Sequence, residues 1–366
     1  MGKKGKKKNI NKDNLPNVSI CTPTFNRRPF FEGLIKSIKF QDYPHEKIEW
    51  IIVDDGTDPI EDILTSKETI EFLHPIKIRY FYVKERMDLG KKRNYMHKQC
   101  SYNNDEDIIV YIDDDDYYPP ERVSHSVKKL IQNKEALCGG SSEIYLWFNT
   151  LDKMYKFGPY GPKHATAGTF SFKRKLLKQT CYEDEAVLAE EKHFLKNYTI
   201  PFVQFDPYKT ILVVSHEQNT FDKKKLLSKE NKYVKESNAK VKDFIKDPIL
   251  QSFYHTDINN ILKDYKPGDV KNKPKVLEEI ARRDKERMEM TKKNIENQYT
   301  GLNIVDQTTG EMKKLTLKES YNLLTNKVNE SQILKKEVIK LNIENQKLKE
   351  EINNLKEQIN NLNKKN

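Results

Sequence analysis

The sequence Asp107-Ile-Ile-Val-Tyr-Ile-Asp-Asp-Asp-Asp-Tyr-Tyr-Pro-Pro-Glu-Arg122 decides the fold. Its apolar run, Ile108 to Ile112, has the pattern of a short buried strand, and it leads directly into the carboxylates Asp113 to Asp116. Adjacent negative charges repel one another, and a divalent metal ion would relieve that repulsion, because hard cations take oxygen ligands. The stretch therefore predicts a strand that ends at a metal site.

Other apolar strands precede this one and alternate with helical patterns. Strands are expected at 18–22, 48–53 and 78–83, and helices at 29–43, 60–72 and 90–100. Later in the chain, the pattern predicts a hairpin of 144–148 and 154–157, helices at 176–182 and 187–198, and a last strand at 211–215. This alternation is typical of βαβ units, and hence of a mainly parallel sheet with flanking helices. The fold class is therefore α/β, and the ligands of such a sheet bind outside the carboxyl ends of its strands.

Charge is unevenly distributed along the 366-residue chain, whose formal net charge is +11. A basic arm at 1–16 has too little apolar surface to order itself. We expect a compact domain at 17–221, a charged and partly helical extension at 222–275, and a helical linker at 276–333. Much of the positive charge lies in the arm and the extension, which argues against a specific nucleic-acid partner. The pattern contains no signal peptide and no transmembrane segment, so a cytoplasmic location is expected, with the arm able to touch membranes peripherally.

Heptads predict a parallel coiled coil over 334–366. One heptad position holds Val338, Asn345, Ile352 and Ile359, and the other holds Leu334, Leu341, Leu348, Leu355 and Leu362. Ile or Val at position a with Leu at position d favours two parallel strands, and a lone Asn at a fixes the register. The tail is therefore expected to form a homodimer; the alternative is that this helix docks on its own domain.

Polar residues follow three of the strands, at 22–26, 54–56 and 113–116. Their sequences restrict the kinds of ligand site that this edge of the sheet can form. An EF-hand numbered from Asp113 requires glycine and glutamate where the chain has Tyr118 and Ser124. Neither a G-x-G-x-x-G motif nor a Walker lysine motif occurs. The remaining interpretation is a carboxylate-held metal ion that grips a substrate diphosphate and acts as a Lewis acid.

Four motifs, in this order and spacing, resemble family 2 glycosyltransferases of GT-A fold, a Rossmann-like architecture. The motifs lie at 18–26, 51–56, 89–94 and 111–116, and the resemblance covers residues 17–221. The segments 189–195 and 215–222 look most like the glycosyltransferases encoded by large DNA viruses. That resemblance would place the protein in the cytoplasm of a host cell.

The resemblance implies roles for residues that bind the donor. Pro23, Phe25 and Asp55 would line the pocket for the nucleotide base, and Gly90 and Arg93 would face the nucleotide-sugar.

The unit Asp113-x-Asp115 matches the DxD motif of the family. Asp115 would bind Mn²⁺ or Mg²⁺ at the diphosphate, and Asp113 or Asp114 would hold the ribose or the donor sugar. Asp116 is assigned to the turn. His216 follows a late strand, where some GT-A enzymes take a further metal ligand; a hydrogen-bonded loop histidine is the alternative.

An inverting transfer needs a base that takes the proton from the acceptor hydroxyl. The family places a carboxylate near the start of a late helix, and the candidates here are Glu190 and Glu191, with Glu183 and Asp184 earlier in the chain. Glu191 is preferred, because the residues after it match the apolar run of the family. A helix face of solvated acids is the alternative.

The resemblance thus implies a metal-dependent, inverting glycosyltransferase of the hexosyltransferase class. Its donor would be a nucleotide-diphosphate sugar, UDP-linked, and its acceptor a hydroxyl of an unknown glycan or protein. Two alternatives stay open at this point: a non-catalytic coiled-coil adaptor with a GT-A-like domain, and a nucleotidyltransferase.

Overall fold

The computed structural model describes residues 14–188, 191–219, 223, 227, 231–298, 302–305, 310–315 and 317–363. The chain divides into one compact unit that ends at Ala281 and a second that begins at Arg282. Each unit is described by itself, and the candidate site lies in the first.

The first unit is built on a central sheet that, among the described residues, has seven strands in the order β3-β2-β1-β4-β8-β5-β9. The strands β1 (Val18–Thr24), β2 (Ile48–Asp54), β3 (Lys77–Tyr82) and β4 (Ile108–Tyr111) pair in parallel, as the sequence predicted. Beyond them, β8 (Ser171–Lys173) runs antiparallel to both β4 and β5 (Cys138–Gly140), and β9 (Phe202–Gln204) is parallel to β5. The α/β fold class with a mainly parallel sheet is confirmed.

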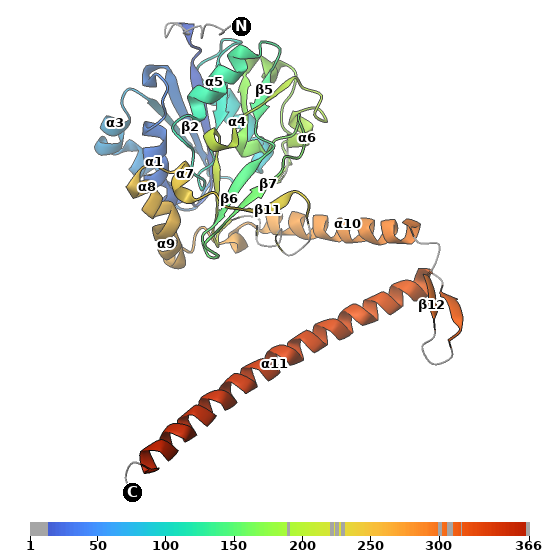
Figure 1. Cartoon of the computed structure of the whole chain (residues 1–366). Helices are drawn as coiled ribbons and strands as arrows, with labels where there is room; N and C mark the ends of the chain where they lie inside the picture. The colour runs from blue at the N-terminus through green and yellow to red at the C-terminus, as the bar shows by residue number, and fades with distance from the viewer. Residues whose placement is uncertain are drawn as a thin grey trace, which may run out of the picture. The chain divides into compact units, whose positions relative to one another are not determined.

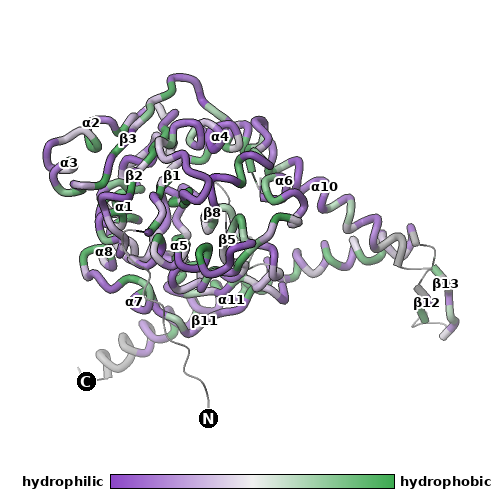
Figure 2. Tube along the Cα trace, turned by 90° about the horizontal axis from the view of Figure 1, so that it is seen from above, coloured by the Kyte–Doolittle hydropathy of each residue, from purple (hydrophilic) through white to green (hydrophobic). Residues whose placement is uncertain are grey.

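Helices cover both faces of this sheet because the buried strands are apolar on both sides. Ile20 and Ile52 pack with Leu34 of α1 (Phe31–Lys39) and Val127 of α5 (Arg122–Gln132). Their neighbours in the strands point the opposite way and pack with Met96 of α4 (Leu89–Gln99). In Figure 2, hydrophobic residues mark the strands and mostly hydrophilic loops surround them.

The helix expected at 60–72 is two helices, α2 (Glu61–Thr65) and α3 (Lys67–Leu73). They separate at Ser66, which has extended backbone angles and whose hydroxyl caps α3 by accepting a hydrogen bond from the N–H of Thr69, at 3.1 Å.

A second sheet, in the order β10-β6-β7-β11, completes the unit. The predicted hairpin is present as β6 (Ile144–Phe148) and β7 (Lys153–Phe157), and the predicted late strand is β10 (Leu212–Ser215), which pairs in parallel with β6. The strand β11 (Val234–Ser237) pairs with β7.

The first unit continues past residue 221, where the sequence placed the end of the domain. Helices α7 (Val241–Phe244), α8 (Pro248–Ser252) and α9 (Ile258–Asp264), with the π-helical turn Phe253–Asp257, supply buried side chains to the second sheet. Phe244 and Tyr254 share one apolar cluster with Trp147 and Leu212. Residues 234–264 are therefore part of the folded unit, because an apolar face of the second sheet is buried by them.

The helices expected at 176–182 and 187–198 are much shorter. Arg174–Lys178 is a 3-10 helix, and α6 is Glu191–Phe194. Lys196, Asn197 and Tyr198 adopt positive φ angles of 47°, 53° and 61°, a left-handed conformation that ends an α-helix. The chain then enters β9.

The helix α10 (Pro274–Gln298), predicted from the sequence, runs across the boundary of the two units. The second unit also holds the hairpin of β12 (Leu302–Val305) and β13 (Met312–Leu315) and the 47-residue helix α11 (Leu317–Asn363), which is continuous in Figure 1. Within α11 the heptad residues from Leu334 to Ile352, whose side chains the structure describes, are exposed in the single chain; Leu341, for example, is 57% exposed. The long helix is therefore confirmed, whereas its pairing stays a prediction. No described helix is long and apolar enough to cross a membrane.

Candidate active site

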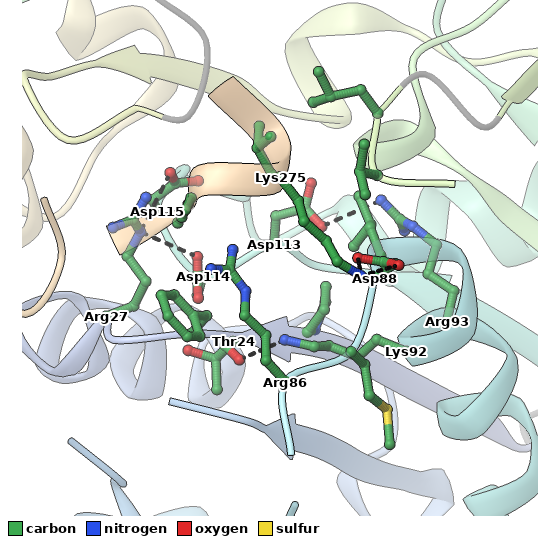
Figure 3. Close-up of a pocket in the computed structure, with 18 of the residues that line it drawn as sticks. Thr24, Arg27, Arg86, Asp88, Lys92, Arg93, Asp113, Asp114, Asp115 and Lys275 are labelled. Atoms are coloured by element: carbon green, nitrogen blue, oxygen red, sulfur yellow. Dashed lines mark hydrogen bonds and ion pairs between the residues drawn. The ribbon is translucent and has the colours of Figure 1, made fainter. Parts of the chain in front are cut away.

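A cavity of about 400 Å³ lies at the carboxyl ends of β1 and β4 (Figure 3). Its lining includes the predicted residues Pro23, Phe25, Arg93, Asp113, Asp114 and Asp115. The remaining lining comes from Thr24, Arg27, Lys92 and residues 86–89, 187–188 and 273–276. The structure thus brings the first, third and fourth sequence motifs together around one space.

Arginine side chains face the predicted DxD motif. The guanidinium of Arg27 is 3% exposed and lies 3.9 Å from Asp114 and 3.7 Å from Asp115. Arg93 lies 3.9 Å from Asp113, as Figure 3 shows. The repulsion within the aspartate run is therefore relieved in part by the chain's own cations, which the sequence argument did not consider.

Asp116 points away from the cavity lining. Its carboxylate accepts a hydrogen bond from the N–H of Val214 in β10, at 2.9 Å. Its carbonyl oxygen accepts one from the hydroxyl of Tyr254, at 3.2 Å. The fourth aspartate thus fastens the second sheet to the DxD motif, in place of the turn role that the sequence suggested.

Burial and mutual repulsion separate the pKa values within the run. Burial, reinforced by the charge of Asp115, raises the pKa of Asp114 to about 7. Burial also acts to raise the pKa of Asp115, but its contact with His216 and the charge of Arg27 outweigh it and hold the pKa well below the usual range. Burial raises the pKa of Asp116 to about 8. Asp115 is therefore better suited than Asp114 or Asp116 to stay ionised.

His216 lies beside Asp115, with Nε2 at 3.3 Å from the carboxylate. Asn219 orients the histidine, because its Oδ1 accepts the N–H of His216 at 2.8 Å and its Nδ2 lies 2.8 Å from Nε2. Burial lowers the pKa of His216 to about 4, so the imidazole is neutral at pH 7.

Asp55, predicted for the base pocket, lies one layer behind the cavity lining. Its carboxylate is hydrogen-bonded to the ammonium of Lys92 and accepts the N–H of Met87 at 2.7 Å. Lys92 also donates to the carbonyl of Thr24 at 2.8 Å. Because Lys92, Met87 and Thr24 do line the cavity, Asp55 fixes three residues of the wall.

Gly90 is likewise absent from the lining. Its N–H donates to the carbonyl of Ala186 at 2.9 Å, and a Cβ at this position would lie 1.9 Å from the carbonyl oxygen of Glu183. Only glycine allows α4 to approach the 183–186 loop so closely. That approach places Val187 and Leu188 at the cavity.

Of the candidate bases, Glu191 is linked to the DxD motif. Its carboxylate accepts the N–H of Ala167 at 3.1 Å, in the 3-10 helix Ala167–Thr169. The next residue, Gly168, lies against Asp113, since a Cβ there would be 2.6 Å from the Asp113 carboxylate. Glu190 lies outside the described residues.

The earlier candidates have other partners. Glu183 is 3.2 Å from His193 at the surface, and Asp184 accepts a hydrogen bond from Asn94 at 2.7 Å. Neither contact leads to the aspartate run, so the geometry favours Glu191 among the described acids.

Comparison with known proteins agrees with the motifs. Residues 19–187 match the family Glycosyl transferase family 2. An 80-residue stretch is 38% identical to TuaG of Bacillus subtilis, whose name assigns it as a glycosyltransferase to teichuronic acid biosynthesis; the stretch is 22% of this chain and 29% of TuaG.

Two solved structures are similar to part of this chain. S. aureus TarS in complex with UDP-GlcNAc has a TM-score of 0.41 and 17% identity, over 55% of this chain and 59% of that one. A mannosyltransferase of Pyrobaculum calidifontis with GDP-Man and Mn²⁺ has a TM-score of 0.44 and 16% identity, over 60% of this chain and 67% of that one. Similarity at this level describes the fold alone. None of these relatives is viral, so the viral resemblance stays a prediction.

The sequence analysis assigned no role to several residues that shape the site. Arg27 stands directly after the first motif and Lys92 lies within the third, so their positions were a usable signal. Arg122 is fully buried and donates to the carbonyls of Tyr111 and Phe170, at 3.0 and 2.8 Å. It holds the end of β4 against the chain segment that enters β8, and no local pattern distinguishes it from a surface arginine.

Proposed function

We propose that the chain transfers a sugar, with inversion, from a nucleotide-diphosphate donor to an acceptor hydroxyl, and that the donor is UDP-linked. The observation that carries this proposal is the cavity, in which Asp113, Asp114 and Asp115 face Arg27 and Arg93 across one space. A site for a nucleotide diphosphate can use carboxylates, which hold a metal ion, together with basic side chains, which bind the phosphates. The presence of a glycosyltransferase family 2 domain supports the same chemistry.

The donor set suits Mn²⁺ or Mg²⁺. Asp115 is ionised, His216 is neutral, and their facing atoms are 3.3 Å apart. The described residues contain no group of three or more His, Cys, Asp or Glu side chains that could hold a metal ion. Asp115 and His216 would therefore hold the ion together with donor oxygens and water, which Mg²⁺ readily keeps. The bound metal ion would stabilise the negative charge that develops on the leaving diphosphate.

We assign the proton acceptor to Glu191. Its link through Ala167 and Gly168 to Asp113 keeps a carboxylate beside the position proposed for the donor sugar. In the transfer, the acceptor oxygen forms a bond to the anomeric carbon while the bond to the diphosphate breaks. The acceptor proton passes to Glu191, and the electron pair leaves with the diphosphate.

We further propose that α11 pairs in parallel with the same helix of a second chain. The exposed heptad residues support this pairing. They form an apolar stripe with one Asn along α11, and such a stripe packs against a second helix of the same kind. The cytoplasm, where nucleotide sugars are made, is the compartment that we propose for the reaction.

The test is donor turnover by the purified full chain. Mixtures of UDP- and GDP-sugars with Mn²⁺ are incubated with the protein, and released nucleoside diphosphate is measured by chromatography. Asp115→Asn should lower the rate at least about 100-fold, whereas Asp105→Asn, a surface acid 2.7 Å from Lys178, should leave it unchanged.

Absence of turnover with every donor, together with absence of Mn²⁺-dependent binding of UDP or GDP, would refute the enzyme and favour the adaptor. With a product in hand, the anomeric configuration by NMR decides inversion.

A further inference from the structure

A segment from outside the glycosyltransferase domain closes one side of the donor cavity. We call residues 265–276 the strap; it follows α9 and includes the 3-10 helix Val270–Asn272 and the first residues of α10. Its last four residues, 273–276, line the cavity with Phe25 and the three aspartates. Family motifs do not include it, since the family match ends at residue 187.

The strap is anchored to the loop that follows β1. The side-chain amide of Asn26 donates to the carbonyl of Pro267 at 2.9 Å, and Arg27 donates to the carbonyl of Gly268 at 3.2 Å. A Cβ on Gly268 would lie 2.0 Å from Oε1 of Gln218 and 3.1 Å from the carbonyl oxygen of Asn26. The contact is therefore so close that only glycine fits without a shift.

Other anchors reach the loops after β2 and β3. The hydroxyl of Tyr265 donates to Asp58 at 2.8 Å. Arg86 donates to the carbonyl of Asn272 at 2.7 Å, and Lys275 forms an ion pair with Asp88 at 3.1 Å, which Figure 3 shows across the cavity. The strap thus ties together three loops at the edge where ligands of a parallel sheet bind.

Lys273 is the buried lysine of the strap at this cavity. It is 8% exposed, and its side-chain nitrogen lies 5.9 Å from the ring centroid of Phe25. It interacts electrostatically with Asp114 and Asp115 and with the cations Arg27 and Lys92. A buried ammonium among other cations is unfavourable unless anions surround it.

The lining as a whole favours an anionic ligand. It contains six basic residues, Arg27, Arg86, Lys92, Arg93, Lys273 and Lys275, and four acidic ones, Asp88, Asp113, Asp114 and Asp115. The cavity is therefore net positive even before a metal ion is counted, which suits a diphosphate. An ammonium is a compact donor of the kind that binds phosphate oxygens.

We propose that Lys273 binds the diphosphate of the donor and that the strap completes the donor site. This inference rests on the proposed function, because it takes a nucleoside diphosphate as the ligand. It assigns a binding residue to a part of the chain that lies 86 residues beyond the end of the family match.

Binding of UDP and of uridine to the full chain, each with Mn²⁺, tests the proposal by calorimetry; GDP and guanosine are measured in parallel. Lys273→Met should weaken binding of the diphosphate by about 10- to 100-fold and leave binding of the nucleoside unchanged. Lys273→Arg should retain most of the affinity. The matched control is Lys271→Met, which changes a 73% exposed lysine of the same strap and should alter neither ligand.

The outcomes of this binding experiment distinguish the role of Lys273 from the proposed function. If the parent binds UDP or GDP and Lys273→Met binds it within threefold, the role of Lys273 is refuted and the proposed function stands. Equal weakening of nucleoside and diphosphate would also refute it, because a purely structural effect of the strap would act on both. Failure of the parent to bind either diphosphate would overturn the proposed function and this inference together.

Discussion

The buried pair of Asp55 and Lys92 allows the sharpest test of how the cavity wall is held. The Asp55 side chain is 0% and the Lys92 side chain 6% exposed, and both make further hydrogen bonds to the backbone. Asp55→Asn keeps the shape but leaves the ammonium of Lys92 buried without its counter-charge. Removing one partner of a buried pair costs about 3–5 kcal/mol, so we expect a loss of that size in the free energy of unfolding.

The double variant separates the pair from its surroundings. Lys92→Met alone leaves the Asp55 carboxylate buried without its counter-charge, so we expect a similar loss in the free energy of unfolding. The double variant, Asp55→Asn with Lys92→Met, removes both charges. Its loss in the free energy of unfolding should therefore be smaller than the sum of the two single losses by at least about 2 kcal/mol. Urea unfolding followed by tryptophan fluorescence suits the measurement, because Trp50 is fully buried in the neighbouring strand.

An exposed pair provides the control. Glu32 and Lys36 form an ion pair at 2.8 Å on α1, and Glu32 is 74% exposed. Glu32→Gln should change the free energy of unfolding by no more than about 0.5 kcal/mol, since solvent screens such pairs. The reasoning is refuted if Asp55→Asn costs less than 1 kcal/mol, or if the two single effects simply add.

Further outcomes follow from buried groups, close contacts and the heptads. Burial lowers the pKa of His97 to about 3, so between pH 6 and 4 the unfolded state binds the proton and the folded state does not. The free energy of unfolding should therefore fall by about 1.4 kcal/mol per pH unit as the pH is lowered, and urea titrations of His97→Gln should lack this contribution. Gly268→Ala should lower the free energy of unfolding by about 1–3 kcal/mol, whereas Gly161→Ala, with open space around it, should be near neutral in the same assay. Leu341→Asp should give a monomer by sedimentation at concentrations where the parent and Lys347→Asp are dimers; an unchanged mass would show that α11 is not the dimer contact.

The sequence predicted the strands and the aspartate motif because both are local features. The runs Ile48–Asp54 and Ile108–Tyr111 are apolar on both faces, and no other element of a soluble domain needs such a run over so short a length. The place of the aspartate run follows from position alone, since a strand in a parallel sheet delivers its next residues to the edge where ligands bind.

The sequence predicted longer helices after residue 174 than the structure contains, and the backbone explains the difference. Apolar and charged residues alternate there with helical spacing, but three successive left-handed residues, 196–198, end α6. Only Asn197 has a side chain that commonly adopts this conformation, so the sequence contains little warning of the turn.

The strap could not be predicted because its contacts are distant in sequence. Arg27 meets the carbonyl of Gly268 across 241 residues, and Asp58 meets Tyr265 across 207. Periodicity and motif spacing describe neighbours within one element or one βαβ unit, and they contain no information on which loop a later segment will cover.

The site combines residues of the sequence motifs with residues of the strap, which contains none of those motifs. The carboxylates that we propose as metal ligands, at 113–115, and part of the charge, at Arg27, Lys92 and Arg93, lie within the sequence motifs or directly beside them. Lys273 and Lys275 come from a segment that is held by backbone carbonyls, at Pro267, Gly268 and Asn272, which any sequence can present. Within the strap, Gly268 permits the close approach and Lys273 reaches the cavity. Substitutions at these two positions should separate binding of the donor from integrity of the motif.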